Sequence, residues 1–273
     1  MFGTEFALSR ARNIGRGEGK TAVGVLAKEA KMNAGKWLDG LGSVGLVFGT
    51  ILLSMAIILS FVVPVSATDD KREAEELVEK ARMTFDNMTT DPNLEALVDL
   101  MKKAKGVFIC PALLKGAFVI GISGGSGVFL ARDEKTRDWN GPAFYTVGGV
   151  SFGLQIGGQA SEVVLVAMTE RGVLALLSTS ARLGADVGIA VGPIGVGASA
   201  ATQNLSADIL SFSRSKGLYG GAAFDGAVVA ARASLNDAYY GKPASPSDIL
   251  IRGDAKNPHA SALIKAVTRT AEK

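Results

Sequence analysis

Apolar positions in residues 70–86, DKREAEELVEKARMTFD, recur with the spacing of one face of an α-helix. The stripe consists of Ala74, Leu77, Val78, Ala81 and Phe85. A helix that lies on a membrane surface carries a polar face rich in lysine and arginine, whereas this polar face mixes glutamates with lysines and arginines. We therefore predict that the helix packs on the core of its own domain.

Three more helices are predicted from capping residues and apolar periodicity. One begins at Asp91-Pro92, with the aspartate as N-cap, runs through LEALVDLMKKA and ends before Gly106. A second spans residues 169–178, TERGVLALLS. The last begins at Asn257-Pro258 and has one apolar face, formed by Ala260, Leu263, Ile264 and Val267.

The chain between Gly106 and Gly226 has a different texture, with 22 glycines in 121 residues. Short apolar runs predict strands separated by turns that contain glycine: GVFIC, AFVIGI, GVFLAR, SFGLQIG, VVLVAMT, DVGIAVG and GAVVAAR. Glycine inside strands is typical of bulges and strong curvature. We expect an α+β fold, in which a curved, Gly-rich antiparallel β-sheet or barrel-like core is flanked by amphipathic helices.

The stretch GISGGSG, residues 121–127, allows two interpretations. Its first five letters match Gly-x-Ser-x-Gly, the nucleophile elbow of serine hydrolases, with Ser123 as nucleophile. That elbow requires a strand, a strained turn and then a helix, but the following VFLAR has the composition of a returning strand. We therefore predict that the stretch is the turn of a β-hairpin. A hydrolase that uses Ser123 and His259 remains a remote alternative.

Composition and charge exclude several kinds of chemistry. The net charge of +3 arises within residues 1–67, because residues 68–273 contain 22 basic and 22 acidic residues. A neutral body lacks the dense basic face that nucleic acid requires. The only cysteine, Cys110, lies in an apolar run and is expected to be a small buried hydrophobic residue, and the only histidine is His259. We expect no metal site, no cofactor and no catalytic residue.

The N-terminal part contains an uncharged apolar run, Val44–Val63, that is long enough to cross a bilayer as a helix. It is followed by Val65-Ser66-Ala67, a pattern typical of a signal-peptidase site, with cleavage after Ala67. Residues 1–67 are therefore predicted to be a signal peptide or an uncleaved membrane anchor, and 68–273 a single domain. Translation starts at Met1 or at Met32. If it starts at Met32, residues 1–31 are not part of the protein. We expect export to the periplasm or cell envelope, where residues 44–63, if retained, tether the body to the inner membrane.

Five stretches, taken in order, resemble the SYLF domain: AKGVFICPALLKGAFVIGISGGSGVFLAR (104–132), WNGPAFYTVGGVSFGLQIGGQASEVVLVAMT (139–169), LGADVGIAVGPIG (183–195), SFSRSKGLYGGAAFDG (211–226) and SDIL (247–250). The resemblance covers about residues 70–251. It implies non-catalytic binding of anionic phospholipid or phosphoinositide-like headgroups, with actin as a further partner of eukaryotic members. It also implies that bacterial members are exported, and an exported protein does not meet actin in its own cell.

Two groups of basic residues are the candidates for such lipid binding. The first lies beside the apolar run after Gly106, and the second beside Phe212 and Tyr219. The candidates are Lys102, Lys103, Lys105 and Lys115, and then Arg214 and Lys216. An ordinary solvated surface is the alternative for both groups. A structural or protein-interaction role in the envelope, without lipid binding, is the alternative for the whole chain, and its oligomeric state is open.

Overall fold

A computed structural model describes seven segments of the chain: 67–117, 120–152, 157–178, 180–195, 207–215, 218–220 and 226–273. All of them belong to one compact unit, Val65–Lys273. No helix in these segments has the length and apolar character needed to cross a membrane. The apolar run Val44–Val63 lies outside the described residues, and its assignment as signal peptide or anchor stays a prediction.

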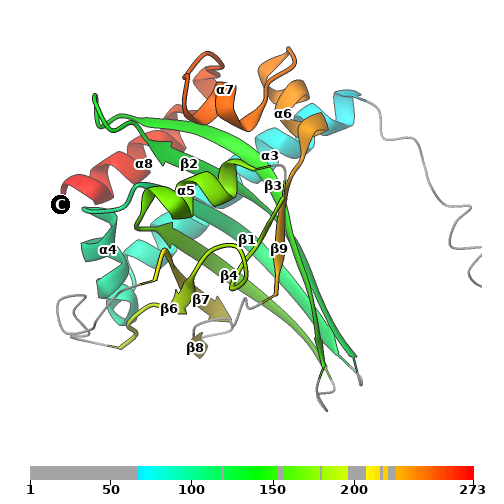
Figure 1. Ribbon diagram of the computed structural model, residues 1–273, viewed down its shortest axis with the longest axis vertical. Helices are drawn as coiled ribbons and strands as arrows, with labels where there is room; N and C mark the ends of the chain where they lie inside the picture. Colours follow the sequence, from blue (N-terminus) through cyan, green and yellow to red (C-terminus); the bar gives the residue numbers. More distant parts are fainter. Residues whose placement is uncertain are drawn as a thin grey trace, which may run out of the picture. The chain divides into compact units, whose positions relative to one another are not determined.

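The described strands form one strongly curled sheet that is open between its two edges (Figure 1). The strand order is β5-β9-β3-β2-β1-β4-β7-β6, and β8 also pairs with β7. The bounds are Gly106–Ala117 (β1), Ile120–Arg132 (β2), Trp139–Phe152 (β3), Gly157–Ala167 (β4), Ser180–Arg182 (β5), Ile189–Val191 (β6), Ile209–Ser215 (β7), Leu218–Gly220 (β8) and Val228–Ala231 (β9). The predicted α+β class and curved sheet are confirmed. The sheet is mixed, however, because β6 pairs with β7 in parallel.

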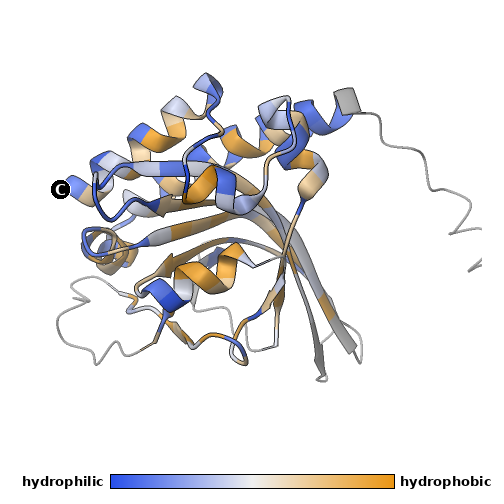
Figure 2. Cartoon of the chain, turned by 45° about the horizontal axis from the view of Figure 1, so that its top comes forward, coloured by the Kyte–Doolittle hydropathy of each residue, from blue (hydrophilic) through white to orange (hydrophobic). Residues whose placement is uncertain are grey.

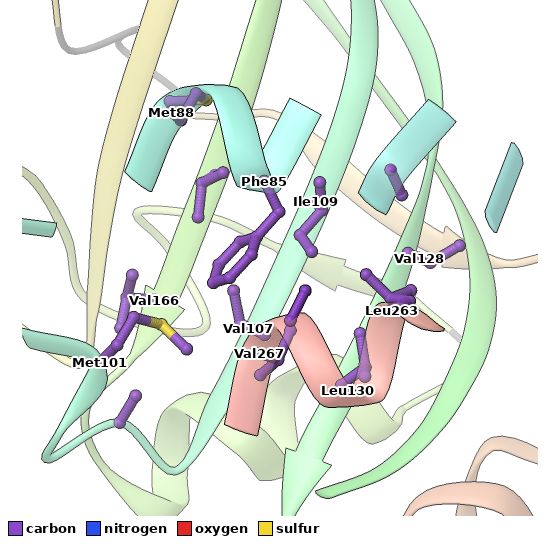
Figure 3. Packing of buried hydrophobic residues seen from close by; sticks show 14 of the residues in the cluster. Phe85, Met88, Met101, Val107, Ile109, Val128, Leu130, Val166, Leu263 and Val267 are labelled. Carbon is purple, nitrogen blue, oxygen red and sulfur yellow. The ribbon is translucent and has the colours of Figure 1, made fainter. Parts of the chain in front are cut away.

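Helices α3 (Ala67–Thr89), α4 (Glu95–Met101) and α8 (Ser261–Glu272) border the first of two hydrophobic clusters. The predicted stripe on α3 is buried throughout, which confirms that this helix packs on its own domain. Figure 3 shows Phe85 of α3 near Val107 and Ile109 of β1, with Val267 of α8 beside Val107, and Met88 and Leu263 belong to the same cluster. Along α8, hydrophilic and hydrophobic residues alternate as they do in an amphipathic helix (Figure 2).

The second cluster lies on the opposite face of the sheet. Phe108, Phe129 and Tyr145 are at its centre. The rings of Phe108 and Phe129 each meet Tyr145 edge to face, at centroid distances of 6.5 and 6.3 Å. This cluster also takes in residues of α5 (Glu170–Leu177) and α7 (Pro246–Leu250). The predicted helix at residues 169–178 is therefore confirmed.

Capping side chains begin three of the helical segments where the sequence predicted them. Asp91 accepts a hydrogen bond from the Asn93 amide before a 3-10 turn, Pro92–Leu94, that leads into α4. Thr169 caps α5, and Asn257 caps the 3-10 turn that precedes α8. Helices α6 (Ala233–Tyr240) and α7 were not predicted, because each is short and lacks a long apolar stripe.

The prediction of a hairpin turn at residues 121–127 is wrong, because the stretch lies inside β2, which pairs with β3 without interruption from Ile120 to Phe129. The chain reverses between Ala117 and Ile120 instead. SFGLQIG likewise spans the end of β3 and the start of β4. Glycine serves close packing here: a Cβ on Gly127 would lie 2.5 Å from Phe108 Cζ.

Candidate functional site

Three lysines of the first predicted group, Lys102, Lys103 and Lys105, lie on the short segment that joins α4 to β1. Two backbone hydrogen bonds fix this segment at the end of the sheet: the Lys105 amide donates to the Ala167 carbonyl oxygen at 2.9 Å, and the Arg132 amide donates to the Lys105 carbonyl oxygen at 2.8 Å. The start of β1, the end of β2 and the end of β4 therefore meet here, near α4 and α5 (Figure 1).

A cavity of about 470 Å³ opens at this junction, and we call it the cationic pocket. Its wall contains five basic and three acidic residues besides one alanine: Lys102, Lys103, Lys105, Arg132, Arg137, Asp133, Glu134, Glu170 and Ala104. Three of the predicted lysines are thus brought together with two arginines that are about 30 positions away in the sequence. The excess of positive charge favours an anionic ligand.

Internal carboxylates already neutralise two of the lysines. Lys105 Nζ donates to Glu134 Oε1 at 2.6 Å and lies 3.3 Å from Glu170 Oε1, and the hydrogen bond to Glu134 is the main cause of the raised pKa of Lys105. Lys102 Nζ pairs with Asp99 at 3.1 Å. Lys103, Arg132 and Arg137, by contrast, form no salt bridge to the described part of the chain. These three cations have no paired carboxylate there, and the five basic and three acidic residues of the wall leave an excess of two positive charges.

Arg132 is the most firmly held of the three cations. Its Nε donates to the Arg137 carbonyl oxygen at 3.1 Å and its Nη1 to the Lys102 carbonyl oxygen at 3.2 Å. The guanidinium carbon lies 5.7 Å from the centre of the Trp139 ring, which is a cation–π contact. Burial, and next the charge of Arg137, lower the pKa of Arg132. A bound anion would relieve that repulsion.

The turn between β2 and β3 presents Arg137 to the pocket. Asp133 Oδ1 accepts hydrogen bonds from the amides of Lys135 and Thr136, both at 2.8 Å. These bonds hold the pKa of Asp133 below its usual range. Arg137 adopts a left-handed backbone with φ of 63°, which is uncommon for a residue with a side chain. The turn is therefore organised before any ligand binds.

A second cavity of about 380 Å³ adjoins the cationic pocket and shares five of its residues, among them Lys105 and Arg132. We call it the apolar pocket, because the remaining wall is mostly hydrophobic and consists of Ala131, Val173, Leu174, Leu250, Ile251 and Lys135. Leu174 is 62% exposed and Ile251 is 51% exposed. The charged cavity thus shares a wall with a cavity whose other side has two uncovered aliphatic side chains.

The other predicted lipid contacts lie elsewhere. Lys115 is near the far end of β1, and Lys216 lies outside the described residues. Arg214 of β7 is held by carboxylates: its Nη2 lies 2.5 Å from Glu162 Oε2 and its Nη1 lies 3.6 Å from Asp91 Oδ2. Arg214 therefore links β7, β4 and the turn before α4. Its contacts are those of a structural residue.

The geometry of a serine hydrolase is absent around Ser123. This residue lies within β2, no helix follows it, and its Oγ donates to the Gly149 carbonyl oxygen at 3.3 Å. His259 Nδ1 lies 3.3 Å from the Tyr239 hydroxyl, and its Nε2 lies 3.9 Å from Glu79. The two residues of that alternative have separate partners, so the elbow interpretation is wrong.

Cys110 is fully buried in the second cluster, as predicted for a small hydrophobic residue. Burial raises the pKa of its thiol to about 12. Near neutral pH the side chain is therefore a thiol and not a reactive thiolate.

Sequence reasoning missed Arg132, Arg137, Leu174 and Ile251. The polar run DEKTRDWNG, residues 133–141, does indicate a turn, and it flags Arg137 as a surface residue. Leu174 and Ile251 carry no local signal, because only the folded chain brings α5 and α7 to the same cavity.

Comparison with known proteins identifies a family that the chain resembles. Residues 148–270 match the family model described as Ysc84, Las17-binding protein actin regulator. Protein YSC84 of Saccharomyces cerevisiae is 30% identical over 167 residues, which are 59% of this chain and 35% of that protein. SH3 domain-containing YSC84-like protein 1 of Homo sapiens is 28% identical over 194 residues, which are 70% of this chain and 55% of that protein. The chain thus spans about a third to a half of the length of these relatives.

The structure defines an α+β half-barrel with a cationic pocket at one end of its sheet. The family match over residues 148–270 and the relatives support the assignment of the chain to the Ysc84, or SYLF, family. The predicted resemblance to the SYLF family is thereby confirmed, and the matched range contains three of the five stretches in full, 183–195, 211–226 and 247–250. The relatives are named as binding and regulatory proteins, and their names describe no enzyme.

Proposed function

We propose that this protein binds an anionic phospholipid without catalysis. The phosphate and headgroup occupy the cationic pocket, with Lys103, Arg132 and Arg137 as the main charge contacts, and the adjoining glycerol and acyl region lies against Leu174 and Ile251. The observation that carries the proposal is the wall of five residues shared by a cavity with an excess of positive charge and a cavity lined on its other side by aliphatic side chains.

Magnitudes show why both pockets are needed. A cation near an anionic leaflet contributes about 1 kcal/mol, so three contribute about 3 kcal/mol. That alone corresponds to a dissociation constant weaker than about 1 mM. Covering the exposed parts of Leu174 and Ile251 adds about 1–2 kcal/mol for each side chain. Charge therefore selects the headgroup, and apolar contact makes the association measurable.

We place this binding in the bacterial cell envelope, on the outer side of the inner membrane. Support comes from the apolar run Val44–Val63 and from Val65-Ser66-Ala67 after it. Fractionation of cells that express the full chain tests the location. Recovery in the cytosolic fraction, with residues 1–67 still attached, would contradict it.

The test of lipid binding uses fragment 68–273 with phosphatidylglycerol or cardiolipin vesicles, and phosphatidylcholine vesicles for comparison. The variant Lys103→Glu/Arg137→Asp reverses two exposed cations and should weaken binding to anionic vesicles at least about tenfold. Higher ionic strength should weaken wild-type binding as well, since surface charges are screened. Native mass spectrometry of the purified fragment should show retained anionic lipid.

The matched control is Lys256→Glu/Lys265→Glu, which makes the same type of charge reversal at exposed sites outside both pockets. This control should stay within about threefold of the wild type. Equal loss in both double variants would show unspecific charge attraction and contradict a site. Equal sedimentation with zwitterionic vesicles would contradict headgroup recognition altogether.

A protein-interaction module is the second candidate function. It is favoured by the relatives' names, which describe binding to Las17 and regulation of actin. For this chain, a protein partner that binds while vesicles are ignored would support the second candidate and overturn the first.

A further inference from the structure

Four strands of the sheet continue past the helices that cover it, toward the lower right of Figure 1. We call this extension the arm. It consists of residues 113–117 of β1, 120–125 of β2, 147–152 of β3 and 157–161 of β4. Pairing within it is regular, with Gly116 opposite Ile122 on one side and opposite Gly158 on the other.

One face of the arm is apolar and exposed. Because directly paired residues project to the same side of a sheet and neighbours alternate, the register assigns Leu114 and Ile122 to one face. Leu114 is 61% exposed and Ile122 is 66% exposed. The described residues of this face are Leu114, Gly116, Ile122, Gly124, Gly148, Gly158 and Ala160. Along β2, the exposed face of the arm is the same face that carries Val128. At Val128 this face is covered by α3.

Charge is found on only one face of the arm. In its four segments the only charged residue is Lys115, and there is no carboxylate. The register places Lys115 opposite Ser123 and Gln159, on the other face from Leu114. A neutral face backed by a single cation complements an anionic lipid surface, and it offers nothing to a strongly charged protein.

A second copy of the chain would cover this face poorly. Four strands about 4.8 Å apart, each with five residues that rise about 3.3 Å, make a face of about 300 Å². Two such faces would bury about 600 Å² in total, below the roughly 1,000 Å² of a specific interface. A bilayer is not limited to this area, because lipid can also cover the edges of the arm around the flat face.

The arm edges set how deep it can lie. Within the described residues, pairing of β3 with β9 ends at Gly148, and pairing of β4 with β7 ends at Glu162. The outer backbone groups beyond these points lack a strand partner there, and such groups do not enter hydrocarbon without a large cost. The arm therefore suits the polar–apolar boundary of a bilayer and not its centre.

We propose that the apolar face of the arm is a second membrane-contacting surface, which rests at the bilayer boundary with Leu114 and Ile122 inserted. It rests on the proposed function in that both require a lipid surface, but it is a separate site. The cationic pocket lies at the start of β1 and the arm at its end, and a strand of 12 residues spans about 40 Å. Arm contact and headgroup binding are therefore independently measurable.

The test uses the full chain in vesicles of phosphatidylglycerol and phosphatidylcholine with brominated acyl chains, which quench a nearby fluorophore. A thiol-reactive dye is attached at Ile122→Cys, and the matched control carries it at Gln159→Cys, an exposed residue on the opposite face of the arm. A second control is Met83→Cys on α3, where the native side chain is 55% exposed. Native Cys110 should not take the dye, because it is fully buried with a thiol pKa of about 12.

We expect quenching at Ile122→Cys to exceed that at either control at least about twofold. Leu114→Ser/Ile122→Ser should keep its thermal unfolding temperature, since both side chains are exposed, and should lower vesicle affinity at least about threefold. Equal quenching at Ile122→Cys and Gln159→Cys would overturn the proposal. So would an Ile122→Cys homodimer cross-link without quenching, which would identify a second copy as the occupant.

The two proposals fail in different ways. Lys103→Glu/Arg137→Asp should lose retained lipid and keep the quenching difference at Ile122→Cys. Retained lipid without that difference would overturn the arm contact and leave headgroup binding intact. A quenching difference without any retained lipid would support the arm contact and count against the pocket.

Discussion

At the scale of single residues, glycine is the feature that most shapes this molecule. Gly125 and Gly127 lie inside β2, and neither has the positive φ that turn glycines such as Gly184 and Gly226 show. A Cβ on Gly125 would lie 2.5 Å from the Ala112 carbonyl oxygen, and one on Gly127 would lie 2.6 Å from that of Ile109. These two glycines let the β1 backbone and the Phe108 ring approach β2 closely. The sequence had predicted a turn at these positions.

This role predicts opposite effects at two glycines of the same strand. Gly127→Ala should destabilise the fold by about 1–3 kcal/mol, because its methyl group must displace the Phe108 ring and the β1 backbone. Gly124→Ala should be neutral or slightly stabilising, since the nearest atom to its Cβ is 4.0 Å away and the unfolded chain loses freedom. Urea unfolding measures both. Equal effects would show that space around Gly127 is not the constraint.

At the scale of elements, the sequence predicted helices better than strand ends. Periodic stripes and caps located α3, α5 and α8, because both signals are local. Apolar runs located the centres of the longer strands, but the ends of β1 and β2 were misplaced. Glycine pairs resemble turns in composition, and only cross-strand packing distinguishes the two.

The network around Arg214 gives a prediction about how elements are joined. Arg214→Gln should destabilise the protein by about 1–3 kcal/mol, because the largely covered carboxylates of Glu162 and Asp91 would lose their shared cation. The same change should leave affinity for anionic vesicles within about twofold, since Arg214 lines neither the cationic nor the apolar pocket. Chemical unfolding and vesicle sedimentation provide the two readouts. If Arg214→Gln kept its stability but lost vesicle binding, Arg214 would be a lipid-binding residue and this prediction would be wrong.

At the scale of the whole molecule, the candidate site was only partly accessible from sequence. Lys102, Lys103 and Lys105 are consecutive enough to be noticed as a cluster. Their partners come from the β2–β3 turn, α5 and α7, and only the curled sheet brings these segments together. The sequence resemblance indicated lipid as a ligand class, whereas the position and the amphipathic form of the pocket required coordinates.

The last prediction concerns where the folding unit begins. The apolar stripe of α3, from Ala74 to Met88, is fully built into the first cluster, so residues 68–273 should unfold cooperatively as a fragment without the preceding 67 residues. Removing α3 as well, in fragment 91–273, would uncover the sheet face around Val107 and Ile109. Loss of Phe85 and Met88 alone costs about 5–10 kcal/mol by the usual values for buried side chains. Most domains have little more stability than that.

Fragment 91–273 should therefore bind a hydrophobic dye and lack a cooperative thermal transition, whereas 68–273 should show a sharp one. A matched control is fragment 68–273 with Glu76→Gln, which alters only the exposed side of α3 and should unfold like the parent. If 91–273 folded as well as 68–273, α3 would be an accessory to the domain. The basis for starting the domain at residue 68 would then be lost, and cleavage after Ala67 would leave a helix with no structural role.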